Sequence, residues 1–216
     1  MKRPQAVFFD LDGTIVDTER VAVETIAEYF AAAGAPISAE DMDFIVGKKW
    51  EYGAEYLLAR YPLSKTAREA EEEIIDQYRL KLRTRIENIA GAPEFVRSLH
   101  GDYRLACVSG SHLKDIRFAL ERFKILDCFE SLVGCEDYKA SKPSPEAYLT
   151  ALARFNLTPG DVVVFEDSHA GLSAAVGAGL RVIQVGTELR IPRQPLLIKQ
   201  IRDYHDSELK KMFAFS

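Results

Sequence analysis

The organisation of this chain is set by a short segment near its start, Phe8-Phe9-Asp10-Leu11-Asp12-Gly13-Thr14. The apolar run that leads into it, residues 6–9, predicts a short buried strand. In an open parallel sheet, ligands lie just beyond the carboxyl ends of the strands. Asp10 and Asp12 follow this strand two residues apart, so both side chains can face the same way. The segment therefore predicts a reactive or binding site at the end of the first strand.

Two carboxylates placed in this way repel each other unless a proton or a cation lies between them. The pair therefore indicates either a metal with oxygen ligands or paired acid and base chemistry. Gly13 allows a sharp exit of the backbone, and the Thr14 hydroxyl can bond a phosphate oxygen. The alternative is a strand followed by an ordinary acidic turn, which an Asp-Gly pair taken alone favours.

Composition and charge narrow the function classes. The chain has 216 residues, of which 47% are hydrophobic and 28% charged, which is typical of a globular protein with one large domain or a domain and an insert. A net charge of −5 argues against general nucleic-acid binding, which needs a basic face. No apolar run approaches the length of a membrane span, and the start, residues 1–4, does not resemble a signal peptide. We expect no membrane partner.

The cysteines and histidines show no metal-ligand spacing. An odd number of cysteines predicts a reduced, cytoplasmic setting in which all three are apolar packing residues: Cys107, Cys128 and Cys135. Surface or helix-capping roles are expected for the histidines, and only His169 is expected near the site: His100, His112, His169 and His205.

The region between the first strand and residue 86 shows helical patterns and no strand signal. Helices are expected up to residue 33, over 39–46, through 57–58 and over about 66–86. Residues 47–50, Gly-Lys-Lys-Trp, are expected to form a loop. We therefore predict a separate helical domain over residues 17–86, inserted into a domain formed by residues 1–16 and 87–216.

From Gly91 onward the pattern changes to alternating helices and strands. Helices are expected over 93–100, 113–123, 145–155 and 170–178, and strands over 104–108, 131–134, 161–165 and 181–185. The tail from about residue 195 is expected to be helical. This alternation predicts an α/β fold, a doubly wound, Rossmann-like parallel sheet with helices on both faces. The inserted helical cap follows the first strand directly, so we expect it to act as a lid.

Right-handed crossovers bring the carboxyl ends of the strands to one edge of the sheet, where six side chains are expected to gather: Asp10, Asp12, Ser109, Lys142, Glu166 and Asp167. Mg²⁺ suits several carboxylates at one point. Asp10 can serve as a nucleophile that forms an aspartyl-phosphate, and Asp12 as a general acid and base. Ser109, the Gly110 amide and Lys142 can bind the phosphoryl oxygens.

Each cluster also has a structural alternative. Ser109 can be a turn residue and Ser111 a helix cap, Lys142 can lie in a surface loop, and Glu166 and Asp167 can cap the following helix. Chemically matched clusters at successive strand ends nevertheless favour a functional interpretation when they are taken together.

Four segments resemble, in order, the motifs of the haloacid dehalogenase superfamily, in the branch with a helical cap after the first strand. That branch contains β-phosphoglucomutase, phosphoglycolate phosphatase and many sugar phosphatases. The resemblance covers nearly the whole chain. It rests on Asp10-Leu11-Asp12-Gly13-Thr14, on Val108-Ser109, on Lys142-Pro143 with Pro145, and on Glu166-Asp167-Ser168 followed by Gly171 and the Ala178-Gly179 turn.

The resemblance implies the roles of the site residues. It implies Asp10 as nucleophile, Asp12 as acid and base, and Ser109 and Lys142 as phosphate binders. It also implies Mg²⁺ bound by the Asp10 and Asp167 side chains and by the Asp12 carbonyl, with Glu166 close by. The expected activity is a Mg²⁺-dependent phosphatase, monomeric or weakly dimeric, that hydrolyses a sugar phosphate or a phosphorylated sugar acid.

Two rival functions are retained. A phosphomutase forms the same aspartyl-phosphate, but that branch carries a cap histidine where this chain has Ala22. The usual Ser-Asn dipeptide of the phosphatases is Ser109-Gly110 here. A signalling receiver is also phosphorylated on an aspartate, but receivers lack an inserted lid. In addition, Asp12 would promote hydrolysis of the aspartyl-phosphate, so the phosphorylated state would not last as a signal.

The expected loop at residues 47–50 is the candidate for substrate specificity. Lys48 or Lys49 can pair with a second anionic group of the metabolite. Trp50 can pack either on a sugar face or inside the cap. The alternative is that both lysines are solvated.

Overall fold

The computed structural model describes residues 3–45, 50–186 and 195–213. The chain divides into two compact units, each described here by itself. The core unit comprises Met1–Val16 and Asn88–Ser216, and the helical unit comprises Asp17–Glu87.

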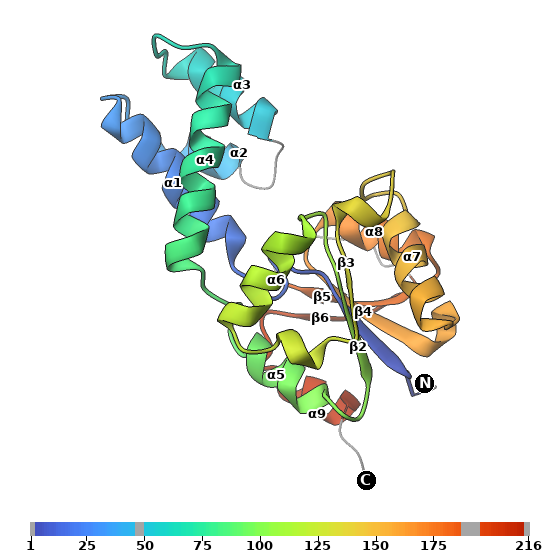
Figure 1. Ribbon diagram of the computed structural model, residues 1–216. Helices are drawn as coiled ribbons and strands as arrows, with labels where there is room; N and C mark the ends of the chain where they lie inside the picture. Colours follow the sequence, from blue (N-terminus) through green and yellow to red (C-terminus); the bar gives the residue numbers. More distant parts are fainter. Residues whose placement is uncertain (1–2, 46–49, 187–194, 214–216) are drawn as a thin grey trace. The chain divides into compact units, whose positions relative to one another are not determined.

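The core unit is built on a parallel sheet (Figure 1). Its strands are β1 (Ala6–Phe9), β2 (Arg104–Val108), β3 (Ser131–Val133), β4 (Val162–Glu166), β5 (Arg181–Val185) and β6 (Leu197–Ile201). They lie in the order β3-β2-β1-β4-β5-β6, and every neighbouring pair is parallel. This confirms the predicted α/β, Rossmann-like fold. Since β1 lies between β2 and β4, the segments that leave these three strands meet at one edge of the sheet.

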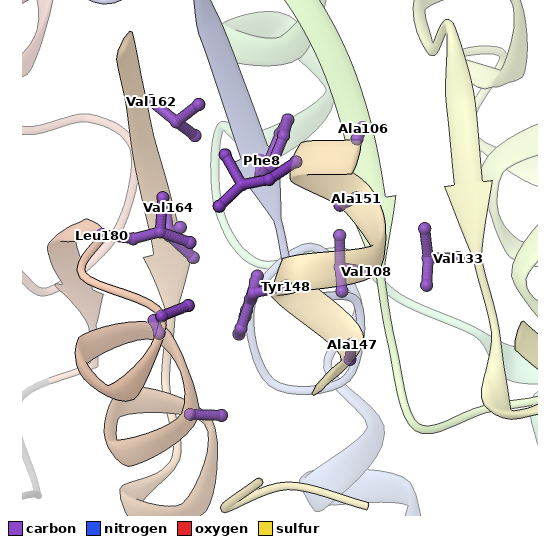
Figure 2. Close-up of a cluster of buried hydrophobic side chains, with 14 of the residues drawn as sticks. Phe8, Ala106, Val108, Val133, Ala147, Tyr148, Ala151, Val162, Val164 and Leu180 are labelled. Atoms are coloured by element: carbon purple, nitrogen blue, oxygen red, sulfur yellow. The ribbon is translucent and has the colours of Figure 1, made fainter. Parts of the chain in front are cut away.

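Helices cover both faces of this sheet because the strands are apolar on both sides. They are α5 (Ala92–Leu99), α6 (Leu113–Arg122), α7 (Glu146–Phe155), α8 (His169–Gly177) and α9 (Ser207–Phe213). On one face, Phe8 of β1 packs with Tyr148 and Ala151 of α7 in a buried cluster (Figure 2). On the other face, the ring of Phe9 lies 6.3 Å from that of Phe95 on α5. Burial of both faces explains why the strands read as continuous apolar runs.

The predicted helical tail is wrong in its first part. Residues Leu197–Ile201 form strand β6, which pairs in parallel with β5, and the helix begins only at Ser207. The Asp206 carboxylate accepts the backbone amides of Glu208 and Leu209 at 2.9 and 3.0 Å, which fixes that start. A five-residue edge strand that carries Lys199 and Gln200 has too weak a pattern to be separated from a helix by periodicity.

The helical unit contains α1 (Thr18–Ala32), α2 (Ala39–Ile45), α3 (Trp50–Arg60) and α4 (Ala67–Arg85), and no strand among its described residues. Phe30, Leu57 and Ile74 lie at the centre of its own apolar core. Thr66 begins α4 with a capping box: its hydroxyl accepts the Glu69 amide, and the Glu69 carboxylate accepts the Thr66 amide at 2.8 Å.

The expected loop over residues 47–50 is only partly described. Trp50 is the first residue of α3, not a loop residue, and its ring lies 5.2 Å from that of Tyr78 against the core of the helical unit. Lys48 and Lys49 lie outside the described residues. In the described parts of the chain, none of the helices combines the length and the apolar character that crossing a membrane requires.

Candidate functional site

Lys142 joins the ends of two strands at the edge of the core sheet. Its Nζ lies 2.6 Å from Asp10 Oδ1, just beyond β1, and 2.6 Å from Glu166 Oε1, at the end of β4. It also donates to the Val108 carbonyl at 3.1 Å. Burial lowers the pKa of Lys142, but the carboxylates of Asp10 and Glu166 outweigh it, so the pKa lies well above its usual range. Lys142 is therefore a buried, fixed positive charge.

Three carboxylates surround this charge. Asp10, Glu166 and Asp167 each offer an oxygen, and these oxygens lie within 4.8 Å of one another. Burial, with the charges of neighbouring carboxylates, raises the pKa of Asp10 well above its ordinary value. Burial and the Glu166 charge raise the pKa of Asp167 to about 7. Carboxylates that resist ionisation because of one another favour a divalent cation, and an all-oxygen donor set fits Mg²⁺.

Two glycines allow the carboxylates to come this close. Gly13 has a φ of +77°, and a Cβ on it would lie 2.0 Å from Asp167 Oδ2. A Cβ on Gly171 would lie 1.8 Å from Glu166 Oε1. Both contacts are far shorter than any side chain can tolerate, so the backbone packs directly on the two carboxylates.

Asp12 is held by two serines from the loop after β2. Ser109 and Ser111 both donate to Asp12 Oδ2, at 3.1 and 2.7 Å, and the Ser111 amide donates to the Ser109 hydroxyl at 3.0 Å. The structural alternative, in which Ser111 caps the next helix, does not hold, because the N-cap of α6 is His112. The two-residue spacing of the serines, which mirrors that of Asp10 and Asp12, is the sequence signal that points to Ser111.

Glu166 is completely buried, with both oxygens engaged. Besides Lys142, it accepts the Tyr148 hydroxyl at 2.8 Å and the Asp167 amide at 3.1 Å. It does not cap α8, because that cap is Ser168, whose hydroxyl accepts the Gly171 amide at 3.0 Å. Tyr148 was not singled out from the sequence, where nothing distinguishes it from other apolar-face residues of a helix.

The remaining predicted site residues are placed as follows. Thr14 is buried, and its hydroxyl donates to Asp167 Oδ1 at 3.3 Å, so its bond to a phosphate stays a prediction. Gly110 is exposed between the two serines. His169 is exposed at the start of α8. The structure thus brings together Asp10, Asp12, Thr14, Ser109, Lys142, Glu166 and Asp167, while Lys48 and Lys49 stay untested.

The chain is similar to two proteins named as phosphatases. It is 30% identical over 198 residues to a bifunctional riboflavin kinase/FMN phosphatase of Arabidopsis thaliana; the match covers 89% of this chain but only 50% of that protein, so the chain spans about half its length. It is also 30% identical over 185 residues to a phosphorylated carbohydrates phosphatase of Thermotoga maritima, with 83% of each chain covered.

A solved structure and a family match are consistent with these two relatives. A crystal structure of a candidate β-phosphoglucomutase from Thermotoga maritima superposes with a TM-score of 0.75 at 26% identity, covering 91% of this chain and 94% of that one. Residues 7–185 match the haloacid dehalogenase-like hydrolases. The predicted class of enzyme, a hydrolase, is confirmed, and the receiver interpretation is removed. With its site motifs inside the matched residues, this chain belongs to the haloacid dehalogenase-like hydrolase family.

Proposed function

We propose that this chain is a Mg²⁺-dependent phosphatase that hydrolyses a small phosphorylated metabolite, a sugar phosphate or phosphorylated sugar acid. The observation that carries the proposal is Lys142 Nζ, held 2.6 Å from both Asp10 and Glu166, beside a carboxylate set suited to a divalent cation. Such a site offers a nucleophile and positive charge for a transferring phosphoryl group at one point. The phosphatase relatives support the same chemistry.

Asp10 and Asp12 divide the chemistry. Asp10 attacks phosphorus and forms an aspartyl-phosphate, while the bond from phosphorus to the leaving oxygen breaks. Asp12 gives its proton to that oxygen and then takes a proton from a water molecule. The water oxygen bonds to phosphorus, the bond from phosphorus to Asp10 breaks, and inorganic phosphate leaves. Ser109 and Ser111, which both donate to Asp12 Oδ2, hold this carboxyl group in one orientation. Lys142 supplies positive charge to the phosphoryl oxygens.

Mg²⁺ would be held by the Asp10 and Asp167 side chains and by the Asp12 carbonyl. When bound, it neutralises charge on the phosphate and lets the carboxylates ionise together. Glu166, whose oxygens already accept hydrogen bonds from Lys142 and Tyr148, adds negative charge and orients Lys142. The all-oxygen chemistry of these donors is the reason for preferring Mg²⁺.

A phosphomutase is the second candidate, favoured by the structural likeness to a candidate β-phosphoglucomutase. Ala22, on α1, occupies the position at which the mutase branch carries a histidine, which argues for hydrolysis. Product analysis with a hexose 1-phosphate separates the two. Hydrolysis yields free hexose and inorganic phosphate, whereas a mutase yields hexose 6-phosphate.

A panel of phosphorylated metabolites, assayed for inorganic phosphate with Mg²⁺ and with chelator, tests the proposal. We expect release from at least one sugar phosphate or sugar acid phosphate with Mg²⁺, none in chelator, and inhibition by Ca²⁺, which prefers more ligands and looser geometry. Full activity in chelator, or no release from any member of the panel, would contradict the proposal.

We propose that Lys48 or Lys49 binds a second anionic group of the substrate. Their charges are the motivation, since an acidic sugar phosphate offers a carboxylate to pair with. Lys48→Ala or Lys49→Ala should raise KM for an acidic sugar phosphate and leave KM for nitrophenyl phosphate unchanged. Wild-type KM values for every substrate would remove both lysines from recognition.

A further inference from the structure

A second cluster of metal-ligating side chains lies in the core unit, apart from the carboxylate set. His112 precedes α6, while Cys135 and Glu136 follow β3 in a single 3₁₀ turn, Cys135–Asp137. His112 Nδ1 lies 3.2 Å from Cys135 Sγ and 3.0 Å from Glu136 Oε1, and Cys135 Sγ lies 3.7 Å from Glu136 Oε2. We propose that His112, Cys135 and Glu136 form a binding site for a borderline-soft divalent metal ion such as Zn²⁺.

The chemistry of these three groups demands something positive between them. A neutral imidazole nitrogen, a thiolate and a carboxylate each point a lone pair at the shared space. Without a metal, protons must fill this space. A metal ion replaces those protons, which leave to solvent, and makes three bonds in place of weak hydrogen bonds.

The spacing of the donors matches a tetrahedral metal. Zn²⁺ bonds of about 2.0–2.3 Å to nitrogen, oxygen and sulfur place neighbouring ligand atoms about 3.3–3.7 Å apart. His112 Nδ1 lies 3.2 Å from Cys135 Sγ and 3.0 Å from Glu136 Oε1, and the other Glu136 oxygen, Oε2, lies 3.7 Å from Cys135 Sγ, all close to this range. One ligand atom from each of the three residues lies within 4.8 Å of the other two. The side chains of His112 and Glu136 are 56% and 44% exposed, which gives an ion access from solvent and leaves the fourth position to water.

Backbone contacts position the two loops that carry the ligands before any metal binds. The Cys135 amide donates to the Ser111 carbonyl at 3.1 Å, which ties the two loops together. The Glu136 carboxylate accepts the Leu113 amide at 3.1 and 3.3 Å, at the start of α6. A Cβ on Gly134 would lie 2.8 Å from Glu136 Oε2 and 2.9 Å from Leu113 Cγ, so only glycine allows this approach. A prearranged site loses little freedom on binding an ion.

The donor set also separates this cluster from the first. Asp10, Glu166 and Asp167 offer only oxygen, which suits Mg²⁺, whereas sulfur and nitrogen favour Zn²⁺ and its neighbours. From the sequence, Cys135 is expected to be a packing residue and His112 to have a surface or helix-capping role, and His112 does lie exposed at the N-cap of α6. The contact between His112 and Cys135 has no signal in the sequence, because the two residues come from two loops that only parallel pairing of β2 and β3 brings together.

Cobalt titration of the full chain tests the site. Co²⁺ bound by a thiolate gives a sulfur-to-metal charge-transfer absorption, which the oxygen-only carboxylate set cannot give. The protein is kept reduced and saturated with Mg²⁺, Co²⁺ is added, and Zn²⁺ is then added as competitor. We expect the absorption to saturate at one Co²⁺ per chain and to disappear with one equivalent of Zn²⁺.

Variants assign the ligands. Cys135→Ser should abolish the absorption, and His112→Ala should weaken Co²⁺ binding more than about 100-fold, since loss of even an outer partner costs 10–100-fold. His112 makes no side-chain capping bond to α6, so its removal spares the fold. Cys128→Ser, at the other partly exposed cysteine, is the matched control and should bind as wild type does. No absorption in the wild type, absorption that survives Cys135→Ser, or unchanged affinity in His112→Ala would overturn the proposal.

Discussion

Two carboxylates, Asp10 in the core unit and Asp41 in the helical unit, are buried to the same extent but have different neighbouring groups. They are 7% and 8% exposed. Asp41 accepts the hydroxyls of Tyr56 at 2.6 Å and Tyr61 at 2.7 Å, and these bonds lower its pKa to about 2. Burial, with neighbouring carboxylates, instead raises the pKa of Asp10. A carboxylate among several donors stabilises a fold, whereas Asp10, which shares Lys142 with Glu166 and lies beside other carboxylates, is prepared for a cation and for chemistry.

Asp10→Asn is expected to have the largest effect. An amide cannot attack phosphorus, so turnover should fall by at least about 10⁴-fold. Asp41→Asn is the matched control, because it makes the same substitution at an equally buried carboxylate, and it should keep kcat. Steady-state kinetics on both variants checks this. Near wild-type turnover in Asp10→Asn would show that Asp10 is not the nucleophile.

Asp12→Asn should lose about 10²–10⁴-fold in kcat, the usual range for general acid and base catalysis. The loss in kcat/KM, which reports formation of the aspartyl-phosphate, should be smaller with nitrophenyl phosphate, whose leaving group needs no proton. Comparison of kcat/KM for a sugar phosphate and for nitrophenyl phosphate measures the difference. Equal losses in kcat/KM on both substrates would argue against protonation of the leaving group by Asp12.

Ser111→Ala should lower kcat about tenfold, because a hydrogen bond to a charged group is lost while Ser109 still holds Asp12. Ser98→Ala, which removes a hydroxyl bonded to the Phe95 carbonyl on α5, is the control and should leave kcat unchanged. The loss in kcat/KM should be smaller with nitrophenyl phosphate, as for Asp12→Asn. An identical loss in kcat/KM on both substrates would mean that Ser111 does not act through protonation of the leaving group by Asp12.

The metal-free protein should become less stable as pH rises toward neutrality. The folded pKa of Asp167 is about 7 against an ordinary value of 3.8, so its folded state holds a proton that the unfolded state has lost. The contribution of Asp167 to the free energy of unfolding is fully present below pH 3.8 and is lost as pH rises through 7. Mg²⁺ should therefore raise the melting temperature more at pH 8 than at pH 5, and Asp167→Asn should flatten that difference. An equal Mg²⁺ effect at both pH values would contradict this.

The contribution of Asp41 to the free energy of unfolding should change with pH in the opposite direction. Its folded pKa of about 2 lies below 3.8, so its contribution is present above pH 3.8 and is lost as pH falls through 2. Asp41→Asn should lower the melting temperature modestly at pH 7 and remove part of the loss on acidification. Mg²⁺ should not alter that difference. A Mg²⁺-dependent change would mean that the two carboxylates are not independent.

Sequence predicted the elements that carry strong local patterns. The apolar run before Asp10 and the alternation after Gly91 fixed the sheet, since buried parallel strands are apolar on both faces. Asp10, Asp12, Lys142 and Glu166 were predicted because they follow strands whose ends must meet at one edge.

The features that the sequence did not reveal depend on contacts between distant segments. β6 has a weak pattern of its own and becomes a strand only by pairing with β5. The Ser111 hydroxyl meets Asp12 across 99 residues, and His112 meets Cys135 across 23. Tyr148 looks like any apolar residue of α7 until its hydroxyl is seen on Glu166. The hydrophobic periodicity of a sequence carries no information about contacts between side chains that lie far apart in the chain.

The central claim is that Asp10 carries the phosphoryl group. The most direct measurement is mass spectrometry of acid-quenched Asp12→Asn protein after brief reaction with nitrophenyl phosphate and Mg²⁺, because loss of the base should slow hydrolysis of the intermediate. We predict one phosphorylated peptide, containing Asp10, that is absent when Asp10→Asn is added to the same protein. A burst of nitrophenol with phosphate on another residue, or with no phosphorylated peptide, would contradict the account.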